Sequence, residues 1–270
     1  LREKHLGTFT LTVVSGISSL WVLVLAPFVG LPAIFASSPL AIAALLSGAL
    51  FFFSGFPYFR ALSIEEASRV VPLWALQAPL TLALAFVFLK ERLLASDYVG
   101  FALVVSGAFF VSSRKASELL RPSKAFLLML IAAVATSLGI VTNKWVYSGL
   151  SFWHVQLLVG LGSGSAALLA MLVLSKKRGS LVGEIAHLKK GGALQLGFRQ
   201  VVIMCAALVF NLAIMTGSAS LSVAFVQTSA FYVLIITALL SRFKPHILEE
   251  PLDKKVLLTN SGTTALMAAF

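Results

Sequence analysis

Long, uninterrupted runs of apolar residues constrain this chain more than any other feature of its sequence. Residues 8–29, 70–89 and 152–174 contain no Asp, Glu, Lys or Arg. A helix of about 20 apolar residues crosses the ~30 Å hydrocarbon core of a bilayer. Backbone groups in lipid must bond to one another, and no sustained alternation of period two suggests a barrel. The sequence therefore predicts an all-α membrane protein.

The composition agrees with this prediction and excludes other classes. Hydrophobic residues make up 59% of the 270 positions and charged residues 11%, whereas soluble domains have about 25% charged residues. The lone Cys205 and four scattered histidines have no metal-ligand spacing, so we expect neither a metal nor a cofactor. The net charge of +11 comes without a basic stripe bearing interleaved aromatics, so we expect no nucleic-acid partner.

About nine transmembrane helices are predicted. A tight turn at 216–218 separates two of them, and a short surface helix fits the polar stretch 175–190. The chain begins without Met, and we expect that both ends are incomplete. The predicted helices are 8–29, 40–59, 70–89, 97–113, 124–142, 152–174, about 196–215, 220–240 and 256–270.

The distribution of basic residues predicts the orientation. Of the 21 Lys and Arg residues, Lys90, Arg92 and Lys144 fall on one side of the predicted bundle and the remaining 18 fall on the other. Basic residues concentrate in cytoplasmic loops. We therefore expect the side with the N-terminus to face the cytoplasm.

The two halves of the chain resemble each other when shifted by about 154–155 residues. The hairpin 40–89 then falls on the hairpin 196–240. The run 8–29, which precedes the first hairpin, is paired with 152–174, which precedes the second, while 124–142 has no partner in the first half. We predict two inverted repeats in a 5+5 arrangement with the first helix absent. Such repeats are typical of secondary transporters, whose sites lie between them near the midplane.

Residues 58–107 resemble the EamA branch of the drug/metabolite transporter superfamily. The similarity lies in the stretches Tyr58-Phe59-Arg60-Ala61-Leu62, Glu66-Ala67-Ser68-Arg69-Val70-Val71-Pro72-Leu73, Leu89-Lys90-Glu91-Arg92-Leu93, Asp97-Tyr98-Val99-Gly100 and Ser106-Gly107, with Pro79 between them. In the second half, Asn143-Lys144 is similar to an Asp/Asn-Lys pair that often closes a family helix.

The resemblance implies ten helices in two inverted repeats around a central cavity, and transport of small metabolites or drugs. Residues 1–116 would be a first repeat of four helices and residues 122–270 a second of five. The family's usual orientation places most basic residues outside, opposite to the charge distribution. Our prediction follows the charge distribution.

Polar residues inside apolar runs are the candidates for a substrate site. Burial in lipid is costly for such groups, so they should face other helices or water. The alternative is that these amides only fasten helices together, and that Lys144 extends to the interface. The candidate substrate-binding residues are Trp74, Gln77, Asn143, Lys144, Gln227, Thr228 and Tyr232.

Pro72 and Pro79 predict kinks in 70–89 that would line a cavity, with a packing kink as the alternative. The glycines of 160–164 suggest close helix packing rather than a phosphate loop, because no strand precedes them and no Lys-Ser/Thr follows. Glu91 stands between two basic residues, which suggests an ion-paired turn that could mark a gate.

The predicted function is a non-enzymatic secondary transporter that moves a small organic solute by alternating access, with export left open. The alternative is a membrane-embedded enzyme or an assembly subunit that acts on lipid-linked substrates. We expect a multi-pass protein of the plasma or cell inner membrane. Its partners would be a small-molecule substrate and membrane lipid, and a homodimer remains compatible with this interpretation.

Overall fold

The structure, a computed structural model, describes residues 7–29, 39–65, 70–92, 94–100, 102–103, 123–174, 181, 183 and 190–227. These residues form helices and short connections, and no strand occurs among them. The first span consists of α1 (Thr8–Ser18), the 3-10 helix η1 (Ser19–Leu25) and α2 (Ala26–Val29). The remaining elements are α4 (Pro39–Ile64), the 3-10 helix η2 (Val71–Leu76), α6 (Gln77–Leu84), the π-helix η3 (Ala85–Leu89), α8 (Lys124–Val146), α9 (Phe152–Val173), α11 (Lys190–Thr216) and α12 (Ala219–Gln227).

Five of the described helical segments are long and apolar enough to cross a membrane. They are Thr8–Val29, Pro39–Ile64, Lys124–Val146, Phe152–Val173 and Gly197–Thr216. A shorter apolar helix covers Leu73–Leu89. The chain is an all-α membrane protein with several spans.

The apolar runs predicted the positions of these spans, and the structure extends several of them. The run 40–59 lengthens to Pro39–Ile64, and the run 124–142 to Lys124–Val146. The predicted helix 97–113 is described only at 97–100 and 102–103, which are helical. The helix predicted at 220–240 begins as α12, but its residues beyond Gln227 lie outside the described part, as do 256–270 and nearly all of 175–189.

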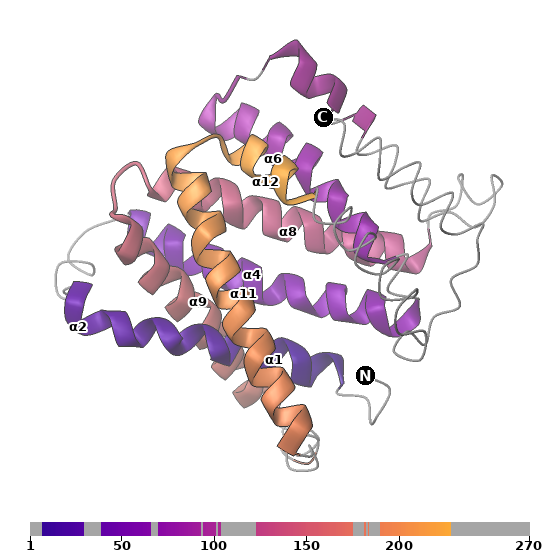
Figure 1. Cartoon of the computed structure of the whole chain (residues 1–270), viewed down its shortest axis with the longest axis vertical. Helices are drawn as coiled ribbons and strands as arrows, with labels where there is room; N and C mark the ends of the chain where they lie inside the picture. The colour runs from indigo at the N-terminus through magenta and orange to yellow at the C-terminus, as the bar shows by residue number, and fades with distance from the viewer. Residues whose placement is uncertain are drawn as a thin grey trace, which may run out of the picture.

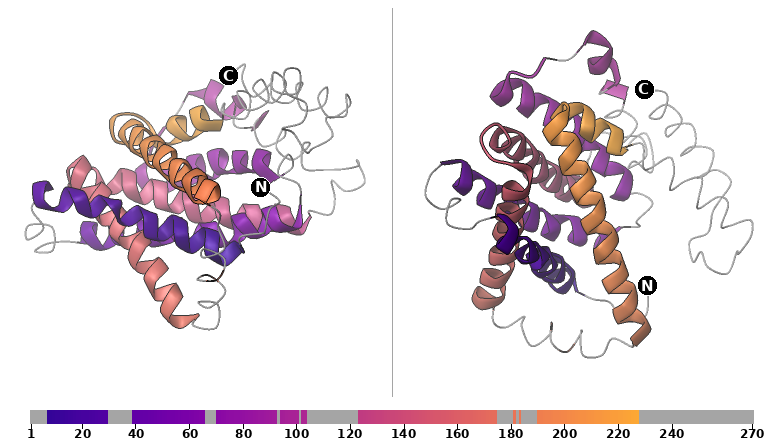
Figure 2. Two further views of the ribbon diagram at one scale, coloured as in Figure 1. Left: turned by 60° about the horizontal axis from the view of Figure 1, so that its bottom comes forward. Right: turned by 60° about the vertical axis from the view of Figure 1, so that its left-hand side comes forward.

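Helix α4 lies at the centre of the bundle. It packs against α8 and α9, and also contacts α1. Helix α8 also contacts α6, and α6 packs against α12, so these helices lie in a row. Helix α11 runs obliquely across the row (Figures 1 and 2). Buried apolar clusters occupy the contacts of α4 with α1 and α9, and of α6 with α12.

Glycine brings α4 and α9 together at backbone distance. A Cβ on Gly48 would overlap the carbonyl oxygen of Val159, and one on Gly162 would overlap that of Leu45. A Cβ on Gly160 would stand 2.8 Å from the carbonyl oxygen of Ser19 in the first span. The prediction that the glycines of 160–164 allow close helix packing is confirmed.

Helix α11 is the least buried of the spans. Only 11% of its most apolar window is buried inside the bundle. The span is attached at two places. Near its start, Arg199 stacks over the Phe59 ring at 5.9 Å, and Gln200 approaches the Ser15 hydroxyl at 3.5 Å. The other attachment, at its C-terminal end, belongs to the candidate site.

Candidate functional site

Asn143 joins three helices through its side-chain amide. It is fully buried on α8, and its Oδ1 accepts a hydrogen bond from Ser47 Oγ of α4. Its Nδ2 lies 3.4 Å from Asn211 Oδ1 of α11, while Asn211 Nδ2 donates to Ala207 O of its own helix at 2.9 Å. These contacts are those expected of an amide that fastens helices together, and they occupy both ends of the Asn143 amide.

Lys144, the next residue, closes the C-terminal end of α11. Its Nζ donates to the carbonyl oxygens of Ile214 at 2.9 Å, Met215 at 3.3 Å and Gly217 at 2.6 Å. The last carbonyls of a helix have no partner within it, and a cation there is favoured by the helix dipole. An ammonium has three donors, so Lys144 can contact a substrate only by releasing one of these carbonyls.

Glu91 performs the complementary role at the start of α12. Its Oε1 accepts from Ala219 N at 3.1 Å, and its Oε2 accepts from Ser220 Oγ at 2.9 Å. A carboxylate at a helix N-terminus satisfies an orphan amide and complements the positive end of the dipole. The sequence-based expectation of an ion pair with Lys90 or Arg92 is wrong, because the carboxylate turns to a helix 128 residues further along the chain.

The backbone at Lys90 directs the chain toward that helix. Lys90 ends the π-helix η3 in the left-handed region, with φ 54 and ψ 29. The amides of Lys90 and Glu91 both donate to the carbonyl oxygen of Ala85. This turn places Glu91 immediately after η3, beside the start of α12.

Two further polar contacts lie at the same end of the bundle. His154 Nε2 lies 2.8 Å from the carbonyl oxygen of Val29, so this nitrogen carries the proton, and Nδ1 lies 2.7 Å from Ser151 Oγ. In the connection after α8, the Tyr147 hydroxyl accepts from Gln156 Nε2 at 2.9 Å. Burial raises the pKa of the Tyr147 phenol, and the hydrogen bond from Gln156 lowers it by less.

Gln77 and Trp74 lie on successive turns of η2 and α6. Gln77 is 4% exposed, and its backbone carbonyl accepts from Ser137 Oγ of α8 at 3.2 Å. Thr81 Oγ1 donates to the same Ser137 hydroxyl at 3.0 Å. Trp74 packs on Tyr58 of α4, with ring centroids 5.0 Å apart.

The predicted proline kinks take the form of changes in helix type. Pro72 lies near the start of η2, and Pro79 is the third residue of α6. The first amides of a helix have no intrahelical acceptor, so Pro72 removes no helical bond. Pro79 lies inside continuous helix, because η2 runs directly into α6, and it removes one amide donor there. The segment continues as 3-10, α and then π helix from Val71 to Leu89.

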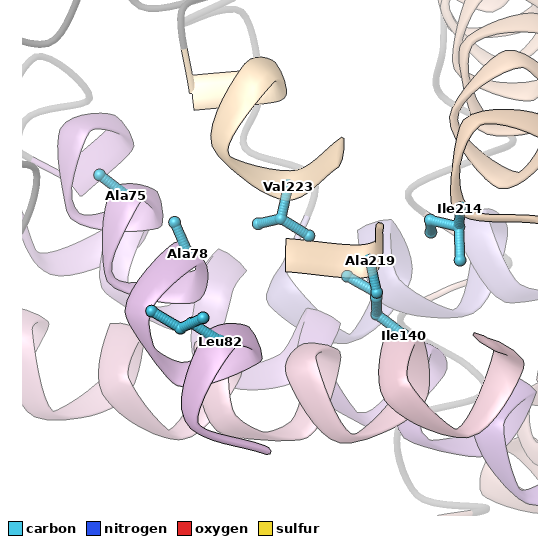
Figure 3. Close-up of a cluster of buried hydrophobic side chains, with 7 residues drawn as sticks. All are labelled: Ala75, Ala78, Leu82, Ile140, Ile214, Ala219 and Val223. Atoms are coloured by element: carbon cyan, nitrogen blue, oxygen red, sulfur yellow. The ribbon is translucent and has the colours of Figure 1, made fainter. Parts of the chain in front are cut away.

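Gln227 ends the described part of α12 and is 7% exposed. Its Nε2 is buried and has no hydrogen-bond partner. Helix α12 packs against η2 and α6, the elements that carry Trp74 and Gln77. Figure 3 shows the apolar cluster between these elements, built from Ala75, Ala78, Leu82, Ile140, Ile214, Ala219 and Val223.

The opposite end of the bundle is hollowed between α1, α4 and α8. The hollow has a volume of about 460 Å³, and its lining combines Arg60 and Thr8 with apolar residues. Arg60 and Ile131 at its rim are exposed. Its lining residues are Thr8, Phe9, Phe56, Pro57, Arg60, Leu128 and Ile131.

The structure thus distributes the candidate residues over two places. Asn143 and Lys144 contact α11, whereas Trp74, Gln77 and Gln227 belong to the α6–α12 region. Thr228 and Tyr232 lie outside the described residues. Sequence reasoning did not select Ser47, Ser137 or Ser220, because nothing in a serine's own sequence context shows which helix it will face.

No protein-family model and no curated protein matches this sequence. Among solved structures, one protein crystal structure aligns with a TM-score of 0.59 at 18% identity, covering 99% of this chain and 88% of that one. At this identity the likeness concerns the fold alone. It extends over nearly the whole chain, as expected for one continuous helical bundle.

Proposed function

We propose that this chain is a secondary transporter of a small organic solute, related to the EamA-type drug/metabolite transporters. Two inverted halves, about nine helices in all, would expose a shared site to either side of the plasma or cell inner membrane in turn. The EamA resemblance of residues 58–107 and the internal repeat motivate this proposal. The fold likeness is compatible with it.

One observation carries the proposal: helices α6 and α12 pack together, and each has a glutamine buried from solvent. Gln77 is 4% exposed and Gln227 7% exposed, and the Nε2 of Gln227 has no partner. A buried donor without a partner costs about 1–3 kcal/mol. A polar ligand that accepts from Gln227 would recover that cost, and small-molecule sites are built from a few such groups against apolar walls.

The pairing of helices supports two related halves. In the predicted repeat, 8–29 corresponds to 152–174, and 70–89 corresponds to 220–240. The structure packs α1 against α9 and α6 against α12. In both cases a helix of the first half contacts the helix that corresponds to it in the predicted repeat. An axis that relates two halves brings equivalent helices together in this way, and transporter sites lie along it.

The test begins with purified protein screened by thermal shift against pools of metabolites, since a bound solute raises the melting temperature. Affinities of the solute found are then measured for Gln77→Leu, Gln227→Leu and Trp74→Ala. Losing one hydrogen bond of ~0.5–1.5 kcal/mol should weaken binding a few-fold to about tenfold. Trp74→Ala should weaken it further through lost contact area.

Gln156→Leu is the matched control, because this buried glutamine lies on α9 and its amide donates to the Tyr147 hydroxyl rather than to a group on α6 or α12. It should leave the affinity unchanged. If Gln77→Leu and Gln227→Leu bind the solute as tightly as the original protein, α6 and α12 do not form the site.

A further inference from the structure

Contacts from two distant segments converge on the turn between α11 and α12. From α8, Lys144 Nζ donates to three carbonyl oxygens, the last of them on Gly217 at 2.6 Å. From the loop after η3, the Glu91 carboxylate accepts from Ala219 N and from Ser220 Oγ. One turn is therefore held by a cation on one flank and an anion on the other.

We propose that Glu91 and Lys144 form a latch that holds the α11–α12 turn and closes this end of the bundle, and that the latch is released when the protein opens here. The proposal rests on the transport function proposed above and identifies the residues that regulate access to its site. Lys144 then acts through the turn, as a positioning residue that leaves direct contact with the solute to α6 and α12.

The charges of the latch match the helix ends that they hold. The C-terminus of α11 carries the negative end of its dipole and faces Lys144, while the N-terminus of α12 carries the positive end and faces Glu91. Hydrogen bonds to charged groups are stronger than those between neutral groups. Exchanging the two charges would place each beside a helix end of its own sign, so the arrangement is specific.

The remaining contacts of α11 show why release would move the turn. Among the described residues, only 11% of its apolar window is buried, and its C-terminal part contacts α8 through Lys144 and through Asn143–Asn211, with Ile214 buried beside them. Helix α12 follows after Gly217 and Ser218 alone. Once the latch opens, α11 and α12 can shift together.

Release would expose the apolar contact behind the turn. Val223, one turn beyond Ala219, is 1% exposed and belongs to the cluster with Ala78 of α6 (Figure 3). Glu91 and Lys144 themselves are only partly buried, so water can take over their hydrogen bonds when the turn moves away. These properties suit a contact that is made and broken repeatedly.

The test measures access to a cysteine behind the turn. Val223→Cys is introduced together with Cys205→Ala, because Cys205 is exposed. A small, membrane-impermeant, charged thiol reagent is applied to intact cells and, separately, to inside-out vesicles. We expect Glu91→Ala to accelerate labelling on the order of tenfold from one side only, through loss of hydrogen bonds to a charge.

Further variants show whether the labelling rate depends on the contacts of the latch. Ser220→Ala removes one hydrogen bond and should give a smaller increase, whereas Lys144→Met should accelerate labelling from the same side as Glu91→Ala. Asp97→Ala removes a carboxylate whose bond among the described residues is the one it accepts from Leu94 N, at the start of its own helix. Ser165→Ala removes a hydroxyl that bonds to Gly162 O within its own helix, α9, away from the turn. Both controls should leave the labelling rate unchanged.

Labelling that is equally slow in Glu91→Ala, Lys144→Met and the original protein would overturn the latch. Labelling that accelerates equally from both sides would also overturn it, because that result indicates general loosening of the bundle. Neither the labelling of intact cells nor that of inside-out vesicles requires a solute. If labelling accelerates from one side but the protein transports nothing, the latch is supported and the transport function is rejected. If the protein transports a solute but labelling does not accelerate, the transport function is supported and the latch is rejected.

Discussion

Asn143 and Lys144 are neighbours in the sequence, but their side chains serve different contacts. Successive helical residues point about 100° apart. Asn143 therefore turns into the contact between α4, α8 and α11, while Lys144 reaches the last carbonyls of α11. The alternative that Lys144 extends to the membrane interface stays a prediction, and in the structure its ammonium donates to the carbonyls at the end of α11.

Lys90 is the described non-glycine residue with positive φ, at 54°. This conformation costs a residue with a side chain about 1–2 kcal/mol, a cost that glycine avoids. We expect Lys90→Gly to be more stable than Lys90→Ala by roughly 1 kcal/mol, because both remove the same exposed side chain and only glycine relieves the backbone. Melting temperatures in detergent provide the measurement, and equal values for the two variants would contradict the left-handed turn.

At the scale of helices, the sequence predicted the existence of the spans because each is an uninterrupted apolar run. It did not predict helix partners. The pairing of Ser47 with Asn143, or of Glu91 with Ser220, joins residues 96 and 129 positions apart. Hydropathy depends on side chains alone and contains no information on which helices meet.

The changes of helix type could also not be predicted from the sequence. Prolines at 72 and 79 predicted a kink, and the structure accommodates them through a 3-10 helix and the first turn of α6. The π-helix at Ala85–Leu89 has no such signal, since its residues are ordinary apolar ones. Its role becomes visible only together with Lys90 and Glu91, whose amides share the carbonyl of Ala85.

The contact between α4 and α9 depends on glycine at backbone distance. A methyl group at residue 162 would overlap the carbonyl oxygen of Leu45, and a backbone oxygen cannot rotate away. We expect Gly162→Ala to force α4 and α9 apart and to destabilise the protein by about 1–3 kcal/mol or more. Thermal unfolding in detergent measures the change.

Gly197→Ala is the matched control for this prediction. A Cβ there meets nothing within 4 Å, and Gly197 lies inside α11. Alanine favours a helix over glycine by about 1 kcal/mol, so the control should unfold at the same or a higher temperature. A Gly162→Ala variant as stable as Gly197→Ala would contradict the close approach of α4 and α9.

At the scale of the whole molecule, the order of the described spans agrees with the predicted alternation of sides. The starts of α1 and α8 meet the end of α4 at the hollow beside Arg60. The end of α2 meets the start of α9 through His154, and the end of α8 meets the end of α11 through Lys144. Glu91, between Lys90 and Arg92, and Lys144 therefore lie at the same end of the described bundle, and the orientation predicted from the distribution of charges stays a prediction.

We propose that the two halves of the chain carry a solute by exposing one site to each side of the membrane in turn. Such a carrier exchanges solute across a membrane, whereas a membrane enzyme converts its substrate and an assembly subunit moves nothing. The difference is visible without knowing the driving ion. It requires only the solute identified by thermal shift and protein reconstituted in vesicles.

Counterflow is the most direct measurement. Vesicles are loaded with an excess of unlabelled solute and diluted into a trace of labelled solute. We expect transient accumulation of label inside, faster than in vesicles without internal solute and slowed by Gln227→Leu. Label that enters only by slow, unsaturable leakage, at the same rate with or without solute inside, would contradict alternating access.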